Sequence, residues 1–342
     1  MTDNKINIVK AGYRSRRLRW IGVTLFLGIV TLALCITLLL IGNTSYPFKI
    51  VVSVLMGEQI QGASFAIGTI RLPRMLSGLM AGIAFGMAGS TFQTILRNPL
   101  ASPDIIGITA GSNVGAIFCI LVLQMSGTFV SMVAVVSGLL VAILIYVLSK
   151  VGSFSGGKLI LVGIGIQAML NAVVSYLLLK ASQHDIPSAY RWLSGSLNGI
   201  QMKSIPSLFV ILMIGGIIIA FLGRHLRILE LGEQSAISLG VRADITRLLL
   251  VLSAVFLIAF ATSVTGPIAF VAFLSGPIAM KLVGTGAPHE LPAGLIGGIL
   301  VLGADLIGQF AFNTRFPVGV ITGILGSPYL LILLIRMNRT GG

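Results

Sequence analysis

Charged residues are scarce in this chain of 342 residues. Asp, Glu, Lys and Arg together make up 9% of it, whereas a soluble domain usually carries about 25%. Residues 105–149 and 248–280 contain none of the four. A membrane-spanning helix needs roughly 20 apolar residues, so the first of these runs holds two spans. The scarcity excludes a soluble globular protein and indicates a polytopic membrane protein.

Cysteine is also rare, and alternating polar–apolar strands are absent. The two cysteines, Cys35 and Cys119, lie within apolar runs, which excludes a disulfide framework and a cysteine-rich metal site. Segments of about ten residues with alternating hydrophobicity, which are typical of a transmembrane β-barrel, do not occur. Because backbone polar groups in lipid must be paired internally, we expect an all-α bundle that forms one permease domain over residues 1–342.

Apolar runs predict about ten spans. The eighth is too short to cross about 30 Å, and we expect Gly276-Pro277 to interrupt it. Glycines four residues apart predict close helix packing; they are Gly78, Gly82, Gly86, Gly107, Gly111, Gly115, Gly294, Gly298, Gly319 and Gly323. The predicted spans are residues 20–42, 74–95, 104–124, 129–149, 158–180, 204–223, 246–265, 272–283, 291–312 and 317–336.

The basic residues predict the orientation. Sixteen Lys and Arg fall on the side of the basic N-terminal tail (residues 1–19) and seven on the other side. The positive-inside rule therefore places both termini and the loop at residues 224–245 in the cytoplasm. The net charge of +14 is explained by these loops, because a nucleic acid partner would require a clustered basic face on a soluble module.

Nucleotide-binding and catalytic motifs are missing. The segment GSFSGGKL (residues 152–159) approaches the phosphate loop G-x-x-x-x-G-K-[ST], but Leu159 replaces the hydroxyl residue that holds Mg²⁺ and no strand precedes it. Metalloprotease and serine-hydrolase motifs are absent too. We therefore expect no catalytic residues, no bound cofactor and no metal site in this chain.

A charged stretch, ELGEQSAISLGVRADITR, interrupts the apolar sequence after residue 229. Gly232 and Gly240 bracket a short predicted helix, in which Glu233 suits the first turn and Gly240 suits the C′ position that ends it. Ala236 and Leu239, three residues apart, form a small apolar knob. So short a helix is not stable alone, and a helix on lipid headgroups would carry basic residues. We expect a protein partner to pack on it.

Polar residues near and within the spans are further candidates. Asn98-Pro99 and Ser102-Pro103 predict a tight turn after Arg97, and we expect Pro73 to break the chain where the second span begins. An acid inside a span is a functional candidate, but Asp305 near the outer third has local pairing as its alternative. The candidates for a translocation path are Asn113, Gln167, Asn171 and Asp305.

Five motifs follow one another along the chain. They are Arg71-x-Pro73-Arg74; Gly89-x-x-Phe92-Gln93 with Arg97-Asn98-Pro99-Leu100-Ala101-x-Pro103-x-x-x-Gly107; Leu231-Gly232-Glu233-x-x-Ala236-x-x-Leu239-Gly240; Gly266-Pro267-Ile268-Ala269-Phe270-Val271; and Pro317-Val318-Gly319 with Thr322-Gly323 and Gly326-x-Pro328. Each is weak alone, but together and in this order they are highly specific. Over nearly its whole length the chain resembles the FecCD-type membrane permeases of ABC importers for iron–siderophore complexes, haem and vitamin B12.

The resemblance implies the partners. It implies a homo- or heterodimer with a path along the subunit interface, and two cytoplasmic ATPase subunits that use ATP and Mg²⁺. An extracytoplasmic binding protein would deliver the chelate to basic residues on the outer face; Arg71 matches such a position. The segment that would couple to the ATPase comprises Leu231, Gly232, Glu233, Ala236, Leu239 and Gly240.

The chain also departs from the family pattern. Ser275-Gly276-Pro277 stands where many members have a V-P-H motif, and Gln309 stands where many have an arginine. Arg315 is a nearby substitute for that second basic docking residue. These departures point to a heterodimer subunit with a distinct partner.

The resemblance implies ATP-driven alternating access in the bacterial inner membrane, in contact with lipid and with no nucleic acid partner. The cargo that we expect is an iron–siderophore, with haem and cobalamin left open. The alternative is a secondary transporter driven by an ion gradient, with Asp305 as the coupling acid. A membrane-embedded enzyme ranks below both because the sequence has no catalytic constellation.

Overall fold

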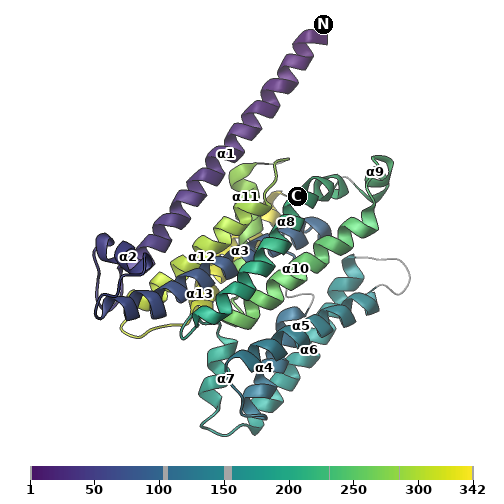
Figure 1. Ribbon diagram of the computed structural model, residues 1–342. Coiled ribbons are helices and arrows are strands. Elements are labelled where there is room, and N and C mark those ends of the chain that lie inside the picture. Colours follow the sequence, from purple (N-terminus) through teal and green to yellow (C-terminus); the bar gives the residue numbers. More distant parts are fainter. Residues whose placement is uncertain (1, 103–106, 150–155, 231, 285, 341–342) are drawn as a thin grey trace.

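The computed structural model describes residues 2–102, 107–149, 156–230, 232–284 and 286–340, and every regular element in them is a helix. Figure 1 shows their arrangement. In chain order they are α1 (Thr2–Leu40), α2 (Phe48–Leu55), the π-helix η1 (Phe65–Arg71), α3 (Leu72–Leu96), α4 (Ile108–Leu121), α5 (Thr128–Ser149), α6 (Gly156–Lys180), α7 (Ile186–Leu193), the 3-10 helix η3 (Met202–Ser204), α8 (Ile205–Glu230), α9 (Glu233–Ser238), α10 (Ala243–Thr265), α11 (Val271–Val283), α12 (Glu290–Phe310) and α13 (Val318–Thr340).

The helices match the predicted spans. Within the described residues, seven helices are long and apolar enough to cross a membrane, and three shorter apolar helices accompany them. The shorter ones are Ile108–Leu121, Val271–Val283 and Val318–Ile332. Each of the ten overlaps one predicted span, and α11, with 13 residues, is the short eighth. The prediction of an all-α polytopic bundle of about ten spans is confirmed, and α2 and α7 are additions to it.

Helix α3 lies at the centre of the bundle. It packs against α8, α10, α11 and α12, and its buried side chains extend along almost its whole length. Helices α4, α5 and α6 pack on one another and meet the rest mainly through α10. In Figure 1 these three form a separate layer, with α2 and α7 toward one end of the bundle and α9 toward the other.

Glycine allows α3 and α12 to touch backbone to backbone. A Cβ added at Gly82 would lie 2.5 Å from the carbonyl oxygen of Gly297, and one at Gly86 would lie 2.2 Å from that of Ala293. These distances are well inside van der Waals contact, so hydrogen is the largest side chain that fits. The close packing expected from Gly82 and Gly86 is observed, and Gly297, which the four-residue spacing did not single out, is part of the same seam.

Helix α11 is continuous through Pro277, so the expected interruption is wrong. Proline has no N–H to bond the carbonyl one turn earlier, which frees the carbonyl of Phe273. The side-chain amide of Gln93 on α3 donates to that oxygen at 2.9 Å. Gly276 provides the room, because a Cβ there would lie 1.9 Å from the Gln93 Oε1 atom. A neighbouring helix thus satisfies the group that the proline exposes.

The second span does not break at Pro73 either. The π-helix η1 runs directly into α3, and Pro73 lies in the first turn of α3. Proline is tolerated in a first turn, and a π-helical segment changes the hydrogen-bond register instead of ending the helix. The apolar span therefore extends over residues 65–96, and its π-helical end carries Arg71.

Candidate functional site

Helix α9 is held in place by a Schellman motif. The N–H of Val241 donates to the carbonyl of Ala236 at 2.9 Å, and the N–H of Gly240 donates to that of Ile237 at 2.9 Å. Gly240 has a φ of +80°, a left-handed conformation that glycine adopts without steric cost. Gly240 therefore occupies the C′ position, and the chain turns sharply from α9 into α10.

The two faces of α9 differ in exposure. Ala236 is fully buried and packs on an apolar cluster with Leu229 and Val241. Ile237 and Leu239 are 59% and 63% exposed. The expected apolar knob is therefore divided: Ala236 anchors α9 to the bundle, whereas Leu239 points away from it together with Ile237, which the sequence had not singled out. Leu231 lies outside the described residues.

The turn after α3 contacts the end of α8, from which α9 follows. Arg97 has a φ of +48°, and its Nη2 atom donates to the carbonyl of Leu229 at 2.6 Å. The Asn98 side chain accepts the backbone N–H two residues later, beyond Pro99, at 2.9 Å. Pro103 lies outside the described residues. This turn thus fastens α3 to the segment that carries α9, a link between distant parts of the chain that sequence spacing does not reveal.

Three of the predicted path residues line one hollow. Asn113 on α4 and Gln167 and Asn171 on α6 border a cavity of about 220 Å³. Its other walls come from α3, α7, α10 and residues 267–273, and none of the described residues that line it is charged. The Oδ1 atom of Asn113 is buried and has no hydrogen-bond partner among the described residues. A buried unpaired acceptor is unfavourable, so this oxygen is ready for a donor on a ligand or a water.

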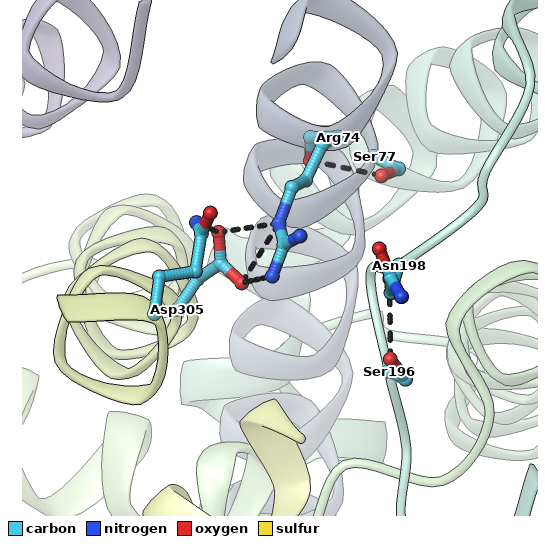
Figure 2. A network of polar contacts seen from close by, with 6 residues as sticks. Arg74, Ser77, Ser196, Asn198 and Asp305 are labelled. Atoms are coloured by element: carbon cyan, nitrogen blue, oxygen red, sulfur yellow. Dashed lines mark hydrogen bonds and ion pairs between the residues drawn. The ribbon is translucent and has the colours of Figure 1, made fainter. Parts of the chain in front are cut away.

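Asp305 lies apart from these amides, in a second hollow of about 180 Å³ that Arg71 and Arg315 also line. Figure 2 shows Arg74 reaching from α3 to the Asp305 carboxylate on α12. The Arg74 Nε and Nη2 atoms donate to the two carboxylate oxygens at 2.8–3.1 Å. Gln309 donates to Oδ2 at 2.8 Å. Asp305, whose side chain is 1% exposed, is thus held by Arg74 on the neighbouring helix and by Gln309 one turn further along its own helix.

The two arginines expected to dock a binding protein both contact the end of α1 or the segment that follows it. Arg71 donates to the carbonyls of Leu39 and Leu40 at 2.8 and 3.1 Å and lies over the Tyr46 ring, 5.2 Å from its centre. It therefore bonds two carbonyls that have no partner within α1, of which that of Leu40 also accepts the Tyr46 N–H at 3.1 Å. Arg315 is exposed and donates to the side chain of Asn43. Together with the Arg74–Asp305 pair, these residues leave the rim of the second hollow with positive charge.

Comparisons with known proteins extend over most of the chain. The FecCD transport family matches residues 29–336. The ferric enterobactin transport system permease protein FepG of Escherichia coli (strain K12) is 38% identical over 84% of this chain and 88% of its own length. FepD, a permease protein of the same system and organism, is 32% identical over 89% of this chain and 92% of its own length.

A solved structure shares the fold. It is an inward-facing conformation of a metal-chelate type ABC transporter, with a TM-score of 0.80, 26% identity, and coverage of 92% of this chain and 99% of the other. The family match covers well over half of the chain and includes α3, the α9 segment and α12. The chain is thus a membrane permease subunit of the siderophore and metal-chelate importer type and belongs to the FecCD transport family.

Proposed function

We propose that this chain moves an iron–siderophore complex into the cytoplasm as the permease subunit of an ABC importer. The observation that carries the proposal is α9, a six-residue helix that is anchored by a buried alanine and presents Ile237 and Leu239 to the surroundings. A pump whose own sequence has no phosphate loop requires a contact with an ATPase, and α9 offers one. Both ferric enterobactin permeases among the relatives support iron–siderophore as the cargo class.

The charge distribution and α9 support one orientation in the membrane. The excess of Lys and Arg on the side of the N-terminal tail supports cytoplasmic termini in a bacterial inner membrane. The same topology would put α9, which lies between the end of α8 at Glu230 and the start of α10 at Ala243, in the cytoplasm, where two ATPase subunits that use ATP and Mg²⁺ would dock. A second permease subunit completes the path. We favour a heterodimer, because the two matching permease proteins FepG and FepD serve one transport system.

The opposite end would receive an extracytoplasmic binding protein. Arg315 is exposed beside Arg71, and the Arg74–Asp305 pair is internally neutral, so the rim attracts acidic side chains. Between the two ends, the uncharged hollow with Asn113, Gln167 and Asn171 offers amide groups to an oxygen-rich chelate. Weak polar contacts of this kind suit passage of a bulky complex, because a tight charged site would retain it.

The geometry of Asp305 argues against the alternative of an ion-driven secondary transporter. Its carboxylate already accepts hydrogen bonds from Arg74 and Gln309. An acid that carries an ion or a proton must exchange its partner in each cycle, whereas this one is fixed between two helices. We assign it to holding α3 against α12.

The experiment is uptake of labelled iron chelates by proteoliposomes that contain the complete transporter. Wild-type complex should import a siderophore only with ATP inside the vesicle and with the binding protein outside. Deletion of residues 233–240, or Glu233→Lys, should abolish co-purification of the ATPase while the permease still inserts into the membrane. Uptake that persists in these variants, or that follows an imposed ion gradient without ATP, would contradict the proposal.

A further inference from the structure

Helix α8 ends in a charged segment whose groups are not all paired. Its last turns carry His225, Arg227 and Leu229 before the chain continues to α9. The Leu229 carbonyl is held by Arg97, which fixes the backbone at this point. By contrast, the Nη1 atom of Arg227 is buried and has no hydrogen-bond partner in the part of the chain that the structure describes. A desolvated guanidinium nitrogen without a partner is unfavourable.

The opposite charge lies on the neighbouring helix. Glu290 is the first residue of α12 and is 3% exposed. Its Oε1 atom also has no hydrogen-bond partner among the residues that the structure describes. Glu290 faces Gly223 of α8, because a Cβ added at Gly223 would lie 3.5 Å from that oxygen. Arg227 lies four residues after Gly223, so the two share one face of α8 and their Cβ positions are about 5–6 Å apart.

Arg227 therefore lies one helical turn along α8 from the position that Glu290 faces. Each carries one buried atom without a hydrogen-bond partner among the described residues, and the ion pair found there is Arg74–Asp305. From the spacing along α8 we infer that an extended arginine side chain can bridge the remaining gap. His289, beside Glu290, contacts the Thr94 hydroxyl at 3.2 Å and so does not take the place of Arg227. A buried polar atom that lacks a hydrogen bond is unfavourable, and pairing these two groups would satisfy both atoms at once.

We propose that Arg227 and Glu290 form an ion pair in a second conformation, which α8 reaches when ATP draws the ATPase subunits together at α9. The pair then holds α8, the helix that continues toward α9, against α12 and thereby against the central helix α3. Arg227 and Glu290 act as positioning residues for the transport step and do not contact the chelate. This inference rests on the proposed function, because it requires α9 to be the segment on which the ATPase acts.

The test is a double-mutant cycle on the complete transporter in proteoliposomes. Arg227→Gln, Glu290→Gln and the double variant are compared with wild type for ATP-driven chelate uptake, ATP hydrolysis and ATPase co-purification, all normalised to the amount of permease in the membrane. Arg227→Lys keeps the charge. Arg224→Gln is the matched control, because Arg224 lies on the exposed side of the same helix.

Each single Gln variant should lower uptake about tenfold, since it leaves the other charge without its partner. The double variant should be no worse than either single one, because contacting residues are non-additive. Arg227→Lys should recover much of the loss, and Arg224→Gln should behave as wild type. ATPase co-purification should stay intact throughout, so that more ATP is hydrolysed per chelate imported.

Losses that add in the double variant, or single variants with wild-type uptake, would overturn the proposal. A variant that fails to accumulate while the double variant accumulates still reports coupling between the two positions. Failure of the proposed function has a different signature. In that case wild-type permease itself would show neither ATPase co-purification nor ATP-driven uptake.

Discussion

Replacing Asp305 by Asn should destabilise the protein strongly although the side chain hardly changes in size. The carboxylate is 1% exposed and the side chain of Arg74 is 14% exposed, so neither charge is well hydrated. Asn removes the negative charge and leaves the Arg74 guanidinium without its counter-ion. Breaking a buried ion pair from one side typically costs about 3–5 kcal/mol, which is a large part of the stability of an ordinary domain.

Two further variants separate charge from hydrogen bonding. Gln309→Leu removes a single hydrogen bond to the same carboxylate and should cost about 1.5–3 kcal/mol, the range for hydrogen bonds to charged groups. The double variant Arg74→Met with Asp305→Leu removes both charges and should recover most of the loss of Asp305→Asn, because apolar replacements of a buried pair are often neutral. Asp305→Asn should therefore be the least stable of the three variants.

The assay is reversible unfolding of the purified permease in mixed micelles with a rising fraction of denaturing detergent. The same variants are then tested for chelate uptake. If Asp305→Asn unfolds within about 0.5 kcal/mol of wild type, or if the double variant is less stable than the single one, the pair does not stabilise α3 against α12. Uptake by the double variant would show in addition that transport needs no ionisable group at position 305.

Three shorter predictions follow from other contacts. Gly89→Ala should destabilise the fold by about 1–3 kcal/mol or more, because its Cβ would lie 1.9 Å from the Ala272 carbonyl oxygen. Gly323→Ala should be neutral in the same unfolding assay, because no described residue lies within 4 Å of the added Cβ. Gln93→Leu should lower the free energy of unfolding by about 1–3 kcal/mol in the same assay, because the Phe273 carbonyl that Pro277 leaves free loses its donor. Leu239→Ser should leave stability unchanged but weaken ATPase co-purification, because the side chain is 63% exposed; normal co-purification would contradict a contact at this residue.

Local sequence signals predicted the elements well, because they depend on nearest neighbours along the chain. Apolar runs located each of the ten spans, and Gly240 was recognised as a helix end from its own conformational freedom. Pro73 and Pro277 were misjudged because the sequence shows only what proline cannot do. In the structure a π-helical turn and the side chain of Gln93 compensate, and both depend on tertiary context.

The candidate site was predicted less completely, because its contacts join distant parts of the chain. Asp305 was recognised as exceptional by its position inside a span, and local pairing was considered, but Arg74 lies 231 positions away. The same holds for the Arg97 contact with Leu229, 132 positions apart. The amides at Asn113 and Gln167 were chosen for polarity alone, and only the packing of α4 against α6 shows that they share one hollow.

The glycine seam between α3 and α12 restricts how the subunit can deform. The backbone contacts repeat every four residues, at Gly82 and Gly86 on α3 and at Gly297 and Ala293 on α12, which corresponds to about 6 Å along the axis. A slide shorter than that repeat would drive neighbouring side chains such as Ile83 into backbone that only hydrogen can face. The two helices therefore cannot slide past each other by a short distance. Any change of shape during a transport cycle must take place around this pair, and the seam supplies the fixed axis against which the other helices move.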